Sequence, residues 1–209
     1  MRISLRFFGR TLLLAIALTI FLPGVTLAGT IDASRPTVLV TGANRGIGLA
    51  FTQHYIGAGW NVLAAVRAPE RATELLELAE TYEHLVIEQL DVTDNERIAA
   101  LAEAYRGTPI DVLINNAGIY GGIEKQAWGS LDSATFQQVL AVNVFAPMKL
   151  AEAFSDHVAA SDQKKIVSIT SGAGVVSRDG RPGGGMFYSV SKASLNMAMR
   201  QVRAELEGR

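Results

Sequence analysis

The sequence contains no cysteine among its 209 residues, which excludes disulfide bonds, thiolate-bound zinc and a cysteine nucleophile. Its only histidines are His54, His84 and His157, and they lack the spacing of metal ligands. We therefore expect no metal site. The formal net charge of −1 lacks the basic excess that binds nucleic acid, so we expect no nucleic-acid partner. Once an N-terminal segment is set aside, one domain of ordinary size remains.

Residues 1–28 have the composition of a targeting segment. Several arginines precede a continuous apolar run over residues 11–22, and residues 26–28 form a small-x-small cleavage signal. We expect a signal peptide that exports the chain to the periplasm or medium, or an uncleaved anchor that brings residues 1–28 into contact with a membrane. A cytoplasmic location is the alternative. We leave this segment out of the fold prediction.

From residue 37 onward, short apolar runs alternate with stretches of helical periodicity. The expected strands are residues 37–40, 61–67, 85–90, 111–114 and 165–170, and the last expected helix runs from about residue 187 to the end. This alternation implies right-handed crossovers and a single Rossmann-like domain with a doubly wound parallel sheet between two helical layers. Ligands of such sheets bind outside the carboxyl ends of the strands.

Local signals predict details of three helices. The sequence Thr93-Asp94-Asn95-Glu96 predicts a capping box in which Thr93 begins a helix. Ser133 is expected to cap the next long helix. Pro147 is expected to kink that helix, because proline has no backbone N–H to donate.

A glycine-rich turn, Thr41-Gly42-Ala43-Asn44-Arg45-Gly46-Ile47-Gly48, joins the first expected strand to the first expected helix. Gly42 allows the chain to turn, and Gly46 and Gly48 let the backbone approach a pyrophosphate. The N-terminus of the helix offers unpaired N–H groups and partial positive charge to that anion. The spacing G-x-x-x-G-x-G differs from the common dinucleotide fingerprint, so a tight turn without a ligand is the alternative.

Tyr188 and Lys192 lie four residues apart in the sequence Tyr-Ser-Val-Ser-Lys. On a helix, this spacing places the phenol and the ammonium group on one face. A nearby cation favours the phenolate, which makes Tyr188 a usable acid or base near neutral pH. The alternative is a solvated helix face on which the pair has no role.

Ser171 follows the last expected strand and precedes a loop rich in glycine that extends to Gly185. Its hydroxyl is suited to hydrogen-bond and polarise the carbonyl oxygen of a substrate. The alternative is a serine that ends a strand or starts a turn.

Two asparagine positions have both a structural and a functional interpretation. Asn143 lies on a stripe of apolar residues and must find hydrogen-bond partners there. It is either a satisfied structural side chain at the kink or the holder of a water that relays protons to Lys192. Asn115-Asn116-Ala117-Gly118 follows the fourth expected strand. It either lets the backbone approach a flat cofactor or simply ends the strand in a turn.

In this order, these residues resemble the short-chain dehydrogenase/reductase family over about residues 36–209. The matching features are the T-G-x-x-x-G-x-G turn, Leu90-Asp91-Val92-Thr93, the N-N-A-G sequence, Asn143, Ser171 and Y-x-x-x-K. The turn and the sequence Arg67-Ala68-Pro69-Glu70 are most similar to the carbonyl-reductase and C-factor-like branch of the classical members.

The resemblance implies an oxidoreductase that uses NAD(P)(H) to interconvert a small aldehyde or ketone and the corresponding alcohol. The implied catalytic residues are Asn143, Ser171, Tyr188 and Lys192. Tyr188 would protonate the carbonyl oxygen as hydride reaches the carbon, and Ser171 would orient that oxygen. Lys192 would favour the phenolate and bind the nicotinamide ribose, and Asn143 would complete a proton relay.

The resemblance also implies a set of cofactor-binding residues. They are Gly42, Asn44, Arg45, Gly46, Ile47, Gly48, Arg67, Asp91, Val92, Asn115, Ala117, Gly118, Tyr188 and Lys192. An NAD site usually has an acidic residue at the end of the second strand, whereas this chain has Val66 and Arg67 there. The guanidinium groups of Arg67 and Arg45 suit a 2′-phosphate, so we predict a preference for NADP(H) and leave NAD(H) open.

Two features depart from the family pattern. The separation of Ser171 from Tyr188 is longer than in most classical members, which leaves the substrate unidentified. The chain stops at Arg209, whereas family members continue into further strands and a substrate-binding loop. We therefore expect the last strands to be missing and one sheet edge to be uncovered. A catalytically inactive dinucleotide-binding fragment or scaffold is the alternative function. A homodimer is left open, because family members commonly pair through two long helices.

Overall fold

The computed structural model describes residues 30–177, 179–180 and 185–207. The expected targeting segment, residues 1–28, lies outside this part of the chain. No helix among the described residues has the length and apolar character needed to cross a membrane. The described strands are β1 (Thr37–Thr41), β2 (Asn61–Val66), β3 (Leu85–Gln89), β4 (Val112–Asn115) and β5 (Lys165–Ser168).

These strands form one parallel sheet in the order β3-β2-β1-β4-β5. The order reverses at β1, and the carboxyl ends of β1 and β4 lie side by side because Val40 pairs with Ile114. In a doubly wound sheet, this reversal is the point at which a crevice opens for a ligand. The predicted fold class is therefore confirmed.

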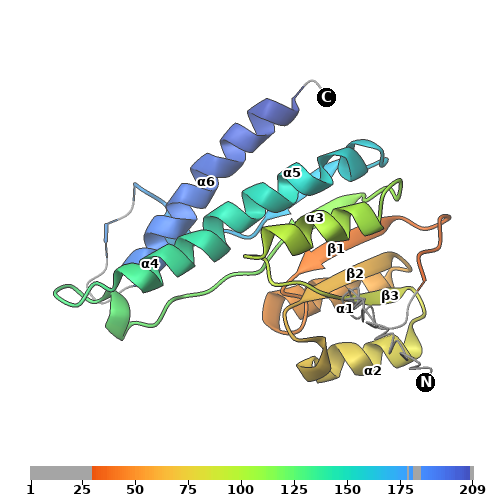
Figure 1. Cartoon of the computed structure of the whole chain (residues 1–209), viewed down its shortest axis with the longest axis horizontal. Helices are drawn as coiled ribbons and strands as arrows, with labels where there is room; N and C mark the ends of the chain where they lie inside the picture. The colour runs from red at the N-terminus through yellow and green to blue at the C-terminus, as the bar shows by residue number, and fades with distance from the viewer. Residues whose placement is uncertain (1–29, 178, 181–184, 208–209) are drawn as a thin grey trace, which may run out of the picture.

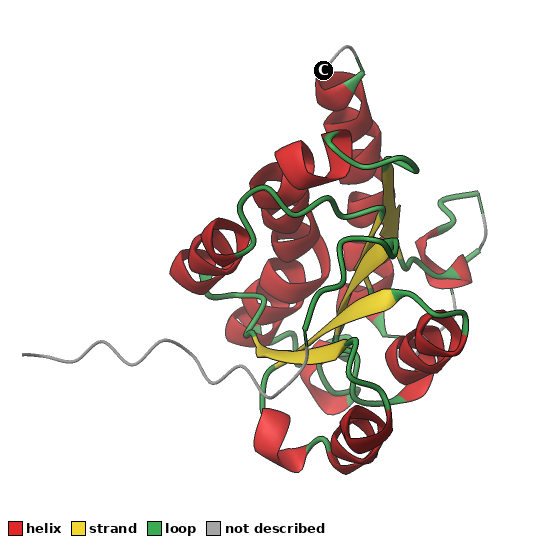
Figure 2. Ribbon diagram, turned by 90° about the vertical axis from the view of Figure 1, so that its right-hand side faces the viewer, coloured by secondary structure: helices red, strands yellow, loops and turns green. Residues whose placement is uncertain are grey.

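Helices cover both faces of the sheet, as Figure 2 shows. The helices are α1 (Gly46–Gly57), α2 (Thr73–Thr81), α3 (Asn95–Ala104), α4 (Ser133–Leu140), α5 (Ala146–Ala159) and α6 (Met186–Leu206). Helices α1 and α2 pack through Leu49, Ile56 and Leu75 on one face of the sheet. Helices α3 and α5 pack on the other face through apolar residues such as Ile98 and Phe154. Helix α6 lies beside α5 (Figure 1).

The strands place successive side chains on opposite faces, which gives the domain two apolar cores. Leu39 and Leu63 face the core under α3 and α5. Val38 and Val62 face the core under α1 and α2. Because both faces are covered, β1 and β2 are buried along their whole length, which explains their continuous apolar sequences.

Two helix starts differ from the prediction by one residue. The cap of α3 is Asp94, whose carboxylate accepts a hydrogen bond from the N–H of Arg97. Thr93 instead donates its hydroxyl proton to Asp91, so the expectation that Thr93 caps this helix was wrong. The cap of α4 is Asp132 rather than Ser133. In both cases a carboxylate reaches the N–H three residues ahead, as an N-cap side chain does.

Helices α4 and α5 are joined by a π-helical turn, η3 (Ala141–Phe145). Pro147 follows directly in the first turn of α5, where its missing N–H is tolerated. Where the kink was predicted, the regular α-helix is thus interrupted by a π-helical turn that ends at Phe145, two residues before the proline. Asn143 lies at the centre of this turn.

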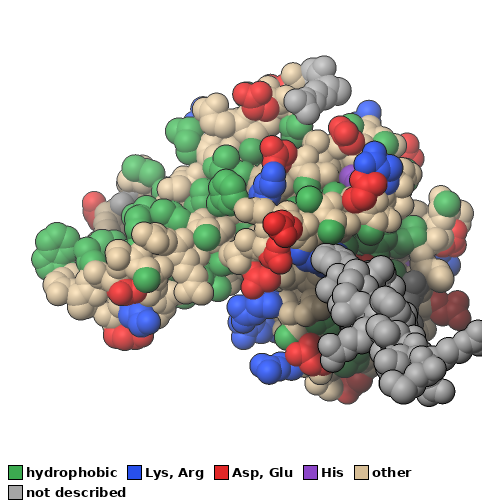
Figure 3. All heavy atoms as spheres, viewed as in Figure 1, with side chains coloured by type: hydrophobic (Ala, Val, Ile, Leu, Met, Phe, Trp, Pro, Cys, Tyr) green, Lys and Arg blue, Asp and Glu red, His purple; other side chains and the backbone are tan. Residues whose placement is uncertain are grey.

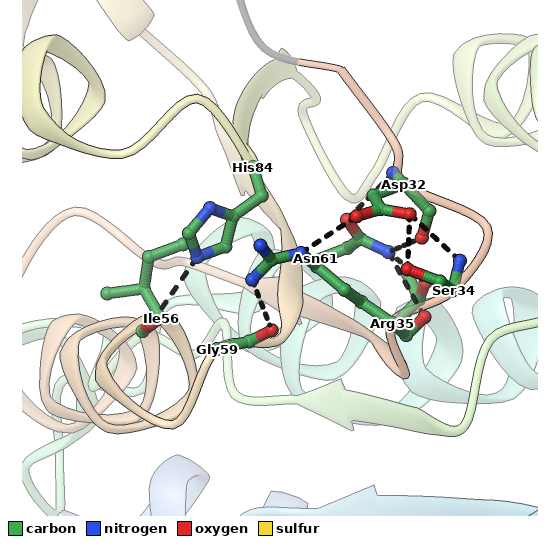
Figure 4. A network of polar contacts seen from close by, with 8 residues as sticks. Asp32, Ser34, Arg35, Ile56, Gly59, Asn61 and His84 are labelled. Atoms are coloured by element: carbon green, nitrogen blue, oxygen red, sulfur yellow. Dashed lines mark hydrogen bonds and ion pairs between the residues drawn. The ribbon is translucent and has the colours of Figure 1, made fainter.

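A polar network fixes the chain where it enters the sheet, at the edge opposite the carboxyl ends of the strands (Figure 4). The buried amide of Asn61 donates to the carbonyl oxygens of Asp32 and Arg35. Arg35 donates to the carboxylate of Asp32 and to the carbonyl of Gly59. The Ser34 hydroxyl and N–H and the Arg35 guanidinium lower the pKa of Asp32 to about 2. Asp32 therefore remains a carboxylate at neutral pH.

Strand β5 is an edge strand of the sheet, as expected, and none of its residues is fully buried. A hollow of about 710 Å³ lies beside it, lined by residues of α5, β5 and α6 such as Val158, Ile166 and Leu195. An exposed apolar region also lies in the segment that joins β4 to α4, where Trp128 is 87% exposed. Figure 3 shows hydrophobic side chains gathered at the end of the molecule that carries α4.

Candidate active site

The glycine turn joins β1 to α1, and its glycines have different surroundings. Gly42 has a φ of +64°, and a Cβ there would lie 3.0 Å from Cα of Ala117. A Cβ at Gly48 would lie 2.2 Å from the carbonyl oxygen of Gly42. Gly46 has a φ of +55° and no atom within 4 Å of its Cβ position. The base of the turn is therefore closed by backbone contacts, while Gly46 faces open space.

The beginning of α1 is open to an anion. Arg45 precedes the helix in an extended conformation and makes no side-chain cap, and the first turn contains no acidic residue. The first N–H groups of a helix have no partner within the helix. Ile47 is 59% exposed next to them. Backbone donors, an open glycine and an uncovered apolar side chain together fit a dinucleotide whose pyrophosphate binds at this end of α1.

Thr41 and Asn116 hold the turn against the end of β4. The amide of Asn116 donates to the carbonyl oxygens of Thr41 and Gly42. The hydroxyl of Thr41 accepts hydrogen bonds from the N–H groups of Asn116 and Ala117. Thr41 belongs to the glycine turn and Asn116 to the N-N-A-G sequence, and no role was predicted for either residue. No local sequence pattern indicates this contact, because the two residues lie about 75 positions apart in the chain.

The N-N-A-G segment divides into a buried and an open part. The amide of Asn115 is buried and donates to Ser168 Oγ at 3.3 Å, and its Oδ1 has no hydrogen-bond partner. Ala117 lies against Gly42, and the Cβ position of Gly118 is 3.8 Å from Nζ of Lys192. Ala117 and Gly118 thus connect the glycine turn to Lys192, whereas the Asn115 side chain joins β4 to β5.

Arg67, Asp91 and Val92 lie beyond the ends of β2 and β3. Arg67 is exposed, and Asp91 is partly buried. Partial burial disfavours the Asp91 carboxylate, but hydrogen bonds from Thr93 and the charge of Arg67 outweigh it and lower the pKa of Asp91. The side chain of Val92 belongs to the apolar core, so only its backbone can approach an adenine ring.

Tyr188 and Lys192 lie on the first turns of α6, on one face as predicted. The Lys192 ammonium nitrogen lies 5.6 Å from the centroid of the Tyr188 ring. It donates to the carbonyl oxygen of Ile169 at 2.7 Å, and the residue is only 5% exposed. Burial lowers the pKa of Lys192. A cation held beside a phenol is suited to stabilise a phenolate.

Ser171 lies between β5 and the 3₁₀ turn η4 (Gly172–Gly174). Its hydroxyl accepts a hydrogen bond from the N–H of Ala173, so it also caps this turn. A Cβ at Gly174 would lie 2.6 Å from the backbone carbon of Lys192. This contact holds the loop after Ser171 directly against α6.

Asn143 is fully buried, and its side chain is saturated by hydrogen bonds. It accepts from the N–H of Ile119 and donates to the Ile119 carbonyl, both at 2.8 Å, and it donates to Ser191 Oγ at 3.0 Å. These hydrogen bonds fit the structural interpretation of Asn143, in which its side chain is satisfied by partners within the fold.

A pocket of about 600 Å³ lies beside Tyr188. It is lined by Tyr120, by the loop from Gly172 to Val176, and by α6 residues that include Ser189. The rings of Tyr120 and Tyr188 are 5.0 Å apart. The larger hollow beside β5 has no contact with Tyr188, so the smaller pocket is the candidate substrate site.

Sequence reasoning missed two further buried residues near Tyr188. Ser191 donates its hydroxyl proton to the Tyr188 carbonyl. Gln126, in the 3₁₀ turn η2 (Glu124–Gln126), accepts hydrogen bonds from the N–H groups of Phe187 and Tyr188. Ser191 lies inside the Y-x-x-x-K motif, but Gln126 stands in a segment without any recognisable pattern.

Comparisons with known proteins agree with this geometry. The family model of the short chain dehydrogenases matches residues 36–209. The chain is 31% identical over 158 residues to (+)-neomenthol dehydrogenase of Arabidopsis thaliana, covering 65% of this chain and 53% of that protein. The chain thus spans about half the length of this relative.

Solved structures give the same result. NADPH-bound carbonyl reductase from chicken fatty liver superposes with a TM-score of 0.72 and 34% identity, over 83% of this chain and 75% of that chain. A carbonyl reductase from Pseudomonas aeruginosa PAO1 in complex with NADP gives a TM-score of 0.72 and 29% identity, over 82% and 73% of the two chains. This chain belongs to the short chain dehydrogenase family.

Proposed function

We propose that this chain is an oxidoreductase that interconverts a small carbonyl compound and its alcohol by hydride transfer with NADP(H). The observation that carries the proposal is the position of Tyr188 and Lys192. They lie at the carboxyl ends of the strands, as the glycine turn does, and Ala117 and Gly118 lie between this pair and the turn. The two carbonyl reductases compared above were solved with NADPH or NADP bound, which supports the choice of cofactor.

In this proposal the chain binds the cofactor and controls one proton. The nicotinamide supplies or accepts a hydride when it is bound. Tyr188 holds the proton at its phenol oxygen and donates it to the substrate oxygen during reduction. Lys192 stabilises the phenolate that remains, because its ammonium group is held beside the ring by the Ile169 carbonyl. Ser171, which directly precedes the pocket residue Gly172, positions the substrate oxygen.

Two measurements test this function. NADPH should raise the melting temperature, because a ligand that binds only the native state stabilises it. Aldehydes and ketones from a test panel should then oxidise NADPH, and this oxidation is monitored at 340 nm. A thermal shift without turnover would support the alternative, a dinucleotide-binding module without activity. No shift with either NADPH or NADH would contradict both the enzyme and the dinucleotide-binding module, and would support an inactive scaffold.

Replacing Arg67 with alanine should weaken NADPH binding and leave NADH binding unchanged. The exposed guanidinium at the end of β2 is free to pair with a 2′-phosphate that NADH lacks. Loss of one charge-assisted contact predicts an increase in the NADPH Michaelis constant of about tenfold. Arg45→Ala, at the start of α1, should act in the same direction.

Arg71→Ala is the matched control for this prediction. Arg71 is exposed in the 3₁₀ turn η1 (Pro69–Arg71), four residues after Arg67, and its guanidinium lies 3.6 Å from the Glu70 carboxylate. We expect this variant to keep the wild-type constants for both cofactors. An unchanged NADPH constant in both Arg67→Ala and Arg45→Ala would remove the assignment of the 2′-phosphate site.

A further inference from the structure

Gln126 is a buried polar residue to which the proposed mechanism assigns no role. The residue is only 4% exposed. The amide nitrogen donates to the carbonyl oxygens of Tyr120, at 2.9 Å, and Gly122, at 2.7 Å. The amide oxygen accepts from the N–H groups of Phe187, at 2.9 Å, and Tyr188, at 3.4 Å. One side chain therefore connects the loop after β4 to the first turn of α6.

Helix α6 depends on this connection because it has no cap of its own. The residue before the helix is Gly185, which has no side chain to accept the first N–H groups. Those groups need acceptors from elsewhere when they are buried. A Cβ at position 185 would lie 2.2 Å from the Tyr120 hydroxyl oxygen. Gly185 thus makes room for Tyr120, and Gln126 supplies the missing cap.

The carbonyl group of Tyr188 is linked to the same loop indirectly, through Ser191 and Asn143. Ser191 Oγ donates to the Tyr188 carbonyl, and Asn143 donates to Ser191 Oγ. Asn143 also holds both backbone groups of Ile119. The Gln126 amide therefore binds the Tyr188 N–H directly, and the Asn143 amide reaches the Tyr188 carbonyl through Ser191. Each of these amides also binds the segment from Ile119 to Gly122.

We propose that Gln126 is a positioning residue that fixes the first turn of α6, and with it the orientation of the Tyr188 phenol towards Lys192 and the pocket. This inference rests on the proposed role of Tyr188 in proton transfer. Gln126 touches neither substrate nor cofactor and acts through the backbone of residues 187 and 188. It also sets the wall of the pocket, because the Tyr120 ring that packs on Tyr188 belongs to the segment that Gln126 holds.

The test compares Gln126→Leu with Gln126→Glu in the full chain. Leucine removes both the donors and the acceptor. Glutamate keeps an acceptor for the two N–H groups, and its negative charge is favourable at a helix N-terminus, but it loses the donors to Tyr120 and Gly122. The controls are Gln138→Leu and Gln138→Glu, because Gln138 is an exposed glutamine on the adjacent helix α4.

We expect Gln126→Leu to lower kcat by about a hundredfold, as a small misplacement of a reacting group does, while KM for NADPH stays within about twofold of wild type. Gln126→Glu should recover a large part of kcat and restore amide hydrogen-exchange protection at Phe187 and Tyr188, which leucine abolishes. Both controls should match wild type. A parallel loss of kcat and NADPH affinity in both Gln126 variants would overturn the inference, since it would indicate a general structural role.

The two proposals fail in different ways. If wild type binds NADPH but turns nothing over, the proposed function fails, and hydrogen exchange still decides the role of Gln126. If wild type is active and Gln126→Leu keeps its kcat and its amide protection, only the positioning role fails.

Discussion

Tyr188→Phe is expected to lower kcat by about a thousandfold, because it removes the hydroxyl that exchanges a proton with the substrate oxygen in the proposed mechanism. The ring of Tyr188 faces the pocket beside Tyr120, and the Lys192 ammonium lies 5.6 Å from its centroid. Phenylalanine keeps the ring contacts and removes only the hydroxyl. Steady-state NADPH oxidation at several pH values measures the effect.

Tyr120→Phe is the matched control, because its ring lies 5.0 Å from that of Tyr188 in the same pocket. We expect it to change kcat by less than about threefold, since Tyr120 has no proton-transfer role in the mechanism. Tyr188→Phe should still show the NADPH-induced thermal shift of wild type. Turnover within tenfold of wild type in Tyr188→Phe would show that another group transfers the proton.

Gly48→Ala is expected to abolish NADPH binding and to lower the free energy of unfolding by about 3 kcal/mol, the cost of overpacking a tightly closed site. The new Cβ would lie 2.2 Å from the Gly42 carbonyl oxygen and 2.5 Å from Nδ2 of Asn116. Both atoms belong to the hydrogen-bonded base of the turn. Relief of this clash must move the backbone that would hold the pyrophosphate. Urea unfolding and NADPH thermal shifts measure the two effects.

Gly57→Ala gives the matched control at the other end of α1. No atom lies within 4 Å of its Cβ position, and its φ is not in the left-handed region. Alanine should therefore be neutral or stabilise the fold by up to about 1 kcal/mol, by restricting the unfolded chain. An NADPH shift in Gly48→Ala equal to that in Gly57→Ala would show that the turn does not bind the cofactor.

Local sequence patterns predicted the scaffold of the site well because they report on properties that neighbours in the chain decide. Buried parallel strands need continuous apolar runs, so β1 and β2 were found to within one residue. The i, i+4 spacing of Tyr188 and Lys192 requires them to share a face once a helix forms there. Helix caps were less certain, since Thr93 and Asp94 both carry suitable oxygens and only the folded chain selects one.

The sequence by itself determined a parallel sheet with helices on both faces, with a glycine turn after its first strand and Ser171 after its last, because apolar periodicity and crossover handedness are local properties. The tertiary structure decided the strand order β3-β2-β1-β4-β5 and placed Lys192 next to Gly118. Only the tertiary structure decided how Tyr188 is held, because Gln126 lies 62 residues away and Asn143 acts through Ser191. A buried amide pairs with the unpaired backbone groups that the fold brings within reach. A local sequence pattern does not identify those groups.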